Sequence, residues 1–210
     1  MTSTFDLCGS TNNDLKLDLD YMDVRKVSKI EKCFYGARLS ELKVQGWKLN
    51  QNKDAAGISF KNLFAGINLQ TIDIRTWEVN NLTSFESTFY GGSITTIYMQ
   101  KISTNKLGSP YILTNMSNMF GCNQSKVLTD VYVGNLHAGS SDLDITRIVY
   151  PSSDSKNSGI KSLYIKNTEA LEINQDKNWI TAALIPNGVG SVTIDTGSIN
   201  SPVIKVLTRP

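Results

Sequence analysis

The chain has 210 residues, of which 40% are hydrophobic and 19% charged, and its 21 Lys and Arg residues against 19 Asp and Glu residues leave a net charge of +2. This composition excludes a disordered chain, because the apolar content is too high and the net charge too low. The near-neutral charge gives no support for nucleic acid as a partner, which needs a clustered basic surface, and no apolar stretch approaches the ~20 residues that span a membrane.

Residues 1–25 are expected to form an N-terminal cap. The opening MTSTFDLCGS lacks the basic segment and apolar run of a signal peptide. The segment DLKLDLD at 14–20 alternates polar and apolar residues, which predicts a strand whose charged side shields the first repeat. Asp18, Asp20 and Asp23 lack the glycine and the terminal glutamate of a calcium loop, so a solvated strand face is expected there and not a metal site.

A repeat of about 30 residues occupies 26–200. Counted from Phe34, Phe64 and Phe89, apolar residues recur four positions before and 5, 8, 10 and 13 positions after each starting residue. The same ladder continues with looser spacing from Phe120, Tyr150 and Leu184. Six repeats in one phase therefore predict six similar structural units.

Each repeat has two parts. The first places apolar residues three and four apart, as in Val27, Ile30 and Phe34, which predicts a short helix. The second alternates apolar and polar residues, which predicts short strands at 42–44, 72–74, 97–99, 131–133, 163–165 and 192–194. We therefore expect an α/β solenoid of about six leucine-rich-repeat-like coils, each a short helix plus a short parallel β-strand.

Two elements are expected at the C-terminal side of this solenoid. Residues 176–185 have the most regular helical spacing, with their apolar residues on one stripe. The closing PVIKVLTRP predicts a last strand, so that residues 201–210 form a C-terminal cap strand.

The stretch FKNLFAGINLQTIDIRTWEVNNLTSFESTFYGGSITTIYM and the stretch LTNMSNMFGC resemble BspA-type leucine-rich repeats. In that family a Met/Phe pair ends each helix, and a Gly/Cys/Asn turn, an L-x-x-L-x-L strand and a Trp-containing segment follow. The resemblance covers about residues 26–200. It implies a binding module and not an enzyme, of the kind found in bacterial and protist surface proteins and, as related repeats, in phage proteins.

If the repeats stack in register, the strand residues between each buried pair point outward from one sheet. The central outward column is then Lys43, Asp73, Tyr98, Tyr132, Tyr164 and Thr193. Tyr98, Tyr132 and Tyr164 predict a binding strip, because tyrosine supplies contact area with little entropy loss. The predicted site also includes Asp73 from the central column and Arg75 from the column after it. Asp73 is in addition expected to form an exposed ion pair with Lys43. An alternative stays open, in which the tyrosines stack across strands for stability alone.

Other chemistry is not indicated. Cys8, Cys33 and Cys122 and the single His137 lack the spacing of a metal site, and the cysteines are expected to be reduced and mostly buried. Trp47 and Trp77 share one phase and are expected in the core. Glu41 and Asp73 would be diagonal neighbours, at a separation that suits the two carboxylates of a glycosidase. Nothing in the sequence predicts a pocket around them, so catalysis by this pair is not expected. No catalytic residue, metal site or cofactor is therefore predicted.

The sequence thus predicts a non-enzymatic binding or assembly protein whose partners are other protein subunits of an assembly or a surface glycan. The leading hypothesis is a structural or host-attachment component of a larger particle such as a phage virion. This places the protein in a virion or on an extracellular surface. One alternative is a bacterial cell-surface adhesin module that binds host protein or glycan. Another is a polysaccharide-acting enzyme on a solenoid, which would need acids and bases gathered in one groove.

Overall fold

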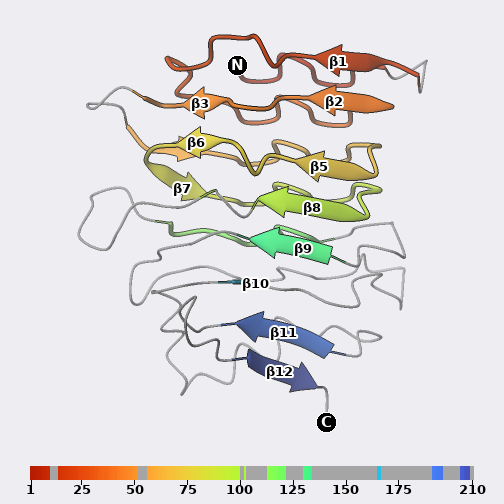
Figure 1. Cartoon of the computed structure of the whole chain (residues 1–210), viewed down its shortest axis with the longest axis vertical. Coiled ribbons are helices and arrows are strands. Elements are labelled where there is room, and N and C mark those ends of the chain that lie inside the picture. Colours follow the sequence, from red (N-terminus) through yellow and green to blue (C-terminus); the bar gives the residue numbers. More distant parts are fainter. Residues whose placement is uncertain are drawn as a thin grey trace.

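A computed structural model describes residues 1–9, 14–51, 56–99, 102, 113–121, 130–133, 165–166, 191–195 and 204–208. Within these residues the chain forms twelve short strands and no helix (Figure 1). The strands are β1 (Lys16–Asp18), β2 (Glu41–Lys43), β3 (Lys48–Leu49), β4 (Ile58–Ser59), β5 (Thr71–Asp73), β6 (Glu78–Val79), β7 (Leu82–Ser84), β8 (Thr96–Met99), β9 (Asp130–Val133), β10 (Ile165–Lys166), β11 (Ser191–Asp195) and β12 (Ile204–Thr208).

Successive repeats form successive layers of a stack, and strands of neighbouring layers pair in parallel. The pairs are β1 with β2, β3 with β6, β4 with β7, β5 with β8, β8 with β9 and β10 with β11. The layers follow one another along the long axis of the molecule (Figure 1). The parallel order ends at β12, which pairs antiparallel with β11.

The predicted strands are confirmed where the structure describes them. Each of the six predicted segments overlaps an observed strand, and the strands predicted in 14–20 and near the C-terminus are present as β1 and β12. The repeats that start at Tyr150 and Leu184, apart from β10 and β11, lie outside the described residues, as does the helix predicted at 176–185.

The predicted fold class, an α/β solenoid with a helix in each coil, is wrong. The segments predicted as helices hold runs of tight turns instead. These runs, which we call turn segments, lie at residues 30–37, 60–67, 85–91 and 116–121, and a fifth lies at 1–8, within the predicted N-terminal cap. In each turn segment, alternate N–H groups donate to a carbonyl three residues earlier, as Cys33 does to Ile30 at 3.2 Å. An α-helix would instead bond each N–H to the carbonyl four residues earlier.

In the turn segments at 1–8, 30–37, 60–67 and 85–91, the N–H groups between these donors bond to carbonyls of the next layer. Phe34 donates to the carbonyl of Leu63 and Phe64 donates to that of Thr88, both at 2.9 Å. Lys32 and Gly36 of the same turn segment have φ angles of +56° and +62°, and Asn62 and Gly66 of the next repeat this pattern. A residue with positive φ every four positions is incompatible with a right-handed α-helix, in which every residue has a φ of about −63°.

The spacing of apolar residues in the sequence does not distinguish a turn segment from an α-helix. Ile30, Cys33, Phe34 and Ala37 are all buried, so that the turn segment hides residues three and four apart, as one face of a helix would. The difference lies in where the backbone hydrogen bonds go, and this depends on the neighbouring layer.

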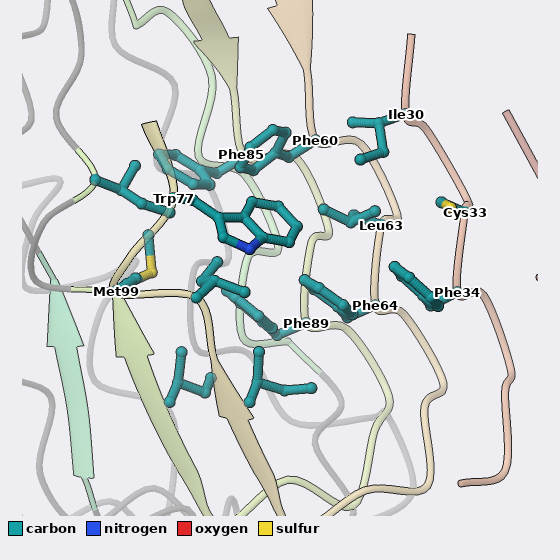
Figure 2. Packing of buried hydrophobic residues seen from close by; sticks show 14 of the residues in the cluster. Ile30, Cys33, Phe34, Phe60, Leu63, Phe64, Trp77, Phe85, Phe89 and Met99 are labelled. Carbon is teal, nitrogen blue, oxygen red and sulfur yellow. The ribbon is translucent and has the colours of Figure 1, made fainter. Parts of the chain in front are cut away.

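A column of phenylalanine rings runs through the core. It consists of Phe5, Phe34, Phe64, Phe89 and Phe120, whose consecutive ring centroids lie 5.4 to 5.7 Å apart with planes within 8° of parallel. Figure 2 shows Phe34, Phe64 and Phe89 side by side from three successive layers. The prediction that Phe34, Phe64, Phe89 and Phe120 occupy the same place in each repeat is confirmed, and Phe5 extends the column to the N-terminal residues.

Trp47 and Trp77 form a second stacked pair with centroids 5.2 Å apart, and each is only 1% exposed. Their predicted place in the core is confirmed. Each indole N–H is bonded to a backbone carbonyl, that of Leu19 for Trp47 and that of Val44 for Trp77. These bonds tie each tryptophan to the preceding layer, because a buried indole N–H needs an acceptor.

Candidate functional site

The parallel sheet of β5, β8 and β9 carries the outward column predicted from the sequence. In its register Asp73 lies opposite Tyr98, and Tyr98 lies opposite Tyr132. Thr71, Thr96 and Asp130 form the neighbouring row. The structure therefore brings Asp73, Tyr98 and Tyr132 into one row across three layers, whereas Tyr164 lies outside the described residues.

Asp73, Arg75 and Tyr98 form one contact cluster on this sheet. The Arg75 guanidinium donates through Nε to both Asp73 carboxylate oxygens at 3.1 Å, and through a terminal nitrogen to Oδ2 at 2.7 Å. The guanidinium carbon lies 4.8 Å from the centroid of the Tyr98 ring, a cation–π distance. The hydrogen bonds from Arg75 to Asp73 raise the pKa of Arg75 above its ordinary value.

Local sequence explains why the cluster forms. Ile72 and Ile74 are buried, so Asp73 and Arg75 between and after them are turned outward. The Asp73 carboxylate also accepts from the backbone N–H of Arg75 at 3.2 Å, which closes a short turn after β5. The Asp73 side chain is 24% exposed and that of Arg75 48%, so the pair is accessible at the surface but held in place.

The predicted ion pair between Lys43 and Asp73 is not formed. The Lys43 ammonium lies 3.4 Å from Asp18 and 3.7 Å from Glu41, while Lys16 lies 3.4 Å from Glu41. The cause is the register of β1 and β2, which places Asp18 directly opposite Lys43. A hydrogen bond to Asp18 is the main cause of the raised pKa of Lys43.

Within the described ranges, no three His, Cys, Asp or Glu side chains are grouped so that they could hold a metal ion. Cys8 and Cys33 are free thiols, and burial raises the pKa of Cys33 to about 11. Cys122 and His137 lie outside the described residues. The part of the chain that the structure describes contains no helix of the length and apolarity needed to cross a membrane.

Comparison with known proteins gives one family. A family described as "Mycoplasma protein of unknown function, DUF285" matches residues 1–131, a range that holds all five turn segments and strands β1 to β8. No curated protein and no solved structure matches the chain.

Proposed function

We propose that this chain, which belongs to the DUF285 family of Mycoplasma proteins, is a non-enzymatic binding protein and contacts another protein through the face formed by β5, β8 and β9. The observation that supports this most directly is the cluster of Asp73, Arg75 and Tyr98. Tyrosine and arginine are enriched among residues that dominate binding energy at protein interfaces.

The cluster is suited to binding because it is already ordered. Asp73 holds the Arg75 guanidinium against the Tyr98 ring, so that neither side chain has to be fixed when a partner arrives. Ordering a flexible side chain on association costs about 0.5–1.5 kcal/mol, and a preformed surface avoids that cost. Strand β9 continues the sheet to a third layer, and its Tyr132 lies opposite Tyr98 in the register.

The positions of the two carboxylates favour binding over the enzyme alternative. Hydrolysis of a polysaccharide needs one carboxylic acid and one carboxylate that face the substrate. Asp73 is engaged by Arg75, and Glu41 lies between Lys16 and Lys43. Each carboxylate is therefore placed as an ion-pair partner.

The biological setting is also proposed from the family. The resemblance of the repeats to BspA-type leucine-rich repeats supports a module on a bacterial cell surface that binds a host protein or a glycan. The phage-virion component that leads the predictions from sequence receives no support from the family match. We therefore place the cell-surface module first and keep the virion component as the second candidate.

The proposal is tested with Arg75→Ala and with the combined variant Tyr98→Ala, Tyr132→Ala and Tyr164→Ala. Tyr35→Ala is the matched control, because Tyr35 is 41% exposed but belongs to a turn segment. Purified proteins are incubated with extracted host-cell surface proteins, and each bound protein is quantified. We expect a partner whose binding falls at least about tenfold in both test variants and is unchanged in the control.

Circular dichroism establishes that each variant is folded. Equal recovery of every bound protein by the wild type and the combined variant would exclude this face as the contact surface.

A further inference from the structure

The N-terminal end of the stack presents the edge of a strand. Strand β1 lies at this end (Figure 1), and among the described strands it pairs with β2 alone. The Leu19 N–H donates to Lys43 O of β2 at 2.8 Å. Because backbone groups alternate in direction along a strand, those of Lys16 and Asp18 are turned away from β2. Such an edge is a template for a further strand.

Apolar side chains at this end are incompletely covered. Phe5, Leu17 and Leu19 are half-buried. In the next layer, which has neighbours on both sides, Phe34 is 0% exposed and Val44 2%. A further molecule stacked on this end would bury the remaining apolar surface, which favours association.

The charges of β1 and β2 alternate in both directions. Lys16 lies 3.4 Å from Glu41, Asp18 lies 3.4 Å from Lys43, and Glu41 lies 3.7 Å from Lys43. Residues 10–13, which precede the strand, carry no charged side chain, so every charge near this edge belongs to a described residue. A strand with one cation and one anion on either side of a central residue is complementary to itself when the second strand runs antiparallel.

We propose that β1 pairs antiparallel with β1 of a second copy of this chain, about a two-fold axis through Leu17. Lys16 of each copy then lies opposite Asp18 of the other, as a two-fold contact requires. The edge-facing backbone groups of these two residues become the hydrogen-bonded pairs of the new ladder. The row of Lys43 and Asp18 continues into Lys16 and Glu41 of the second copy, so the signs alternate across all four strands. This contact uses no residue of the face of β5, β8 and β9.

The charges select this register over its neighbours. A register that keeps the hydrogen bonds but moves the axis to Lys16 or to Asp18 sets that residue against itself, and like charges directly opposite each other are destabilising. In the proposed register Asp14 faces Asp20 of the second copy, but both residues lie outside β1. The Asp20 carboxylate also accepts from the Gln45 N–H at 2.6 Å, in the next layer.

The experiment is sedimentation velocity of the full chain over a concentration series from about 1 μM to about 1 mM. We expect an equilibrium between monomer and dimer with no larger species, because a two-fold pairing uses up the edge of both copies. Added salt should weaken the dimer, since exposed charge pairs are screened.

Two charge variants test the register. Asp18→Lys places two lysines on the edge and Lys16→Asp places two aspartates there, so each variant should dimerise at least about tenfold more weakly than the wild type. An equimolar mixture of the two variants should dimerise again, because each lysine then faces an aspartate. Lys48→Asp is the matched control, because it breaks an exposed pair of the same kind, with Glu78 at 3.0 Å, on β3. Tyr98→Ala should also leave the dimer unchanged, which separates this contact from the sheet face.

Circular dichroism establishes that each variant is folded, and recovery in the mixture shows the same. The proposal is overturned if the wild type stays monomeric or forms larger assemblies. It is also overturned if either charge variant dimerises as well as the wild type, or if the mixture dimerises no better than its two components.

Discussion

At the scale of single residues, Cys33 shows how strongly the turn segments exclude water. Its side chain is fully buried beside Phe34, in a segment whose backbone is bonded to residues 1–8 on one side and 60–67 on the other. Burial penalises the thiolate and raises the pKa of Cys33 from 9.0 to about 11, with smaller opposing contributions from the positively charged N-terminus and from nearby hydrogen bonds. The folded protein therefore favours the neutral thiol. The contribution of this thiol to the free energy of unfolding is complete below pH 9 and is lost as the pH rises toward 11.

This predicts a pH dependence that belongs to one residue. Between pH 9 and pH 11 the free energy of unfolding should fall by up to about 2 kcal/mol more in the wild type than in Cys33→Ala, because only the wild type must keep the thiol protonated. Urea unfolding at several pH values measures both curves. Parallel curves for the two proteins would contradict the buried, protonated state of Cys33.

At the scale of elements, the turn segments are the part of the fold that distinguishes this chain from a helical repeat protein. Lys32 is exposed and has a φ of +56°, a conformation that costs most L-residues energy and that glycine adopts freely. Lys29 lies three residues earlier, is also exposed, and is not among the residues with positive φ. In an α-helix the two positions would be equivalent.

The pair Lys32→Gly and Lys29→Gly therefore tests the turn segment directly. Relief of about 1–2 kcal/mol of backbone strain should leave Lys32→Gly as stable as the wild type or up to about 1 kcal/mol more stable, despite the entropy of glycine. Lys29→Gly should lose about 0.5–1 kcal/mol. The midpoints of urea unfolding measure the difference, and two equal losses would indicate a helix.

At the scale of the whole molecule, each layer contacts the layers directly before and after it. Phe64 is stacked between Phe34 and Phe89 and is fully buried. Phe5 has one described ring neighbour, Phe34, and is half-buried. In such a stack, stability is approximately a sum over layers and over the contacts between neighbouring layers.

The loss of stability on removing a phenylalanine ring should therefore depend on the position of that ring in the stack. Phe64→Ala is expected to lower the free energy of unfolding by about 3–5 kcal/mol, because it removes two ring contacts and leaves a cavity. Phe5→Ala should cost about half as much. Denaturant unfolding of both variants gives the ratio, and a larger loss for Phe5→Ala would show that the N-terminal residues and not the central layers limit stability.

The length of the repeat, the positions of the strands and the buried positions within each repeat were determined by the sequence itself. An apolar residue at a fixed place in each repeat has to be buried whatever the backbone does, so the spacing of apolar residues was enough to align Phe34, Phe64 and Phe89. Strand alternation is equally local, and the row of Asp73, Tyr98 and Tyr132 followed from it once the repeats were stacked in phase.

Tertiary structure alone decided the rest. Turns replace helices because alternate N–H groups of the turn segments at 1–8, 30–37, 60–67 and 85–91 bond to the layer beside them, and a single repeat does not contain that partner. Arg75 lies over Tyr98 because a parallel register joins strands 25 residues apart, and Lys43 turns to Asp18 for the same reason.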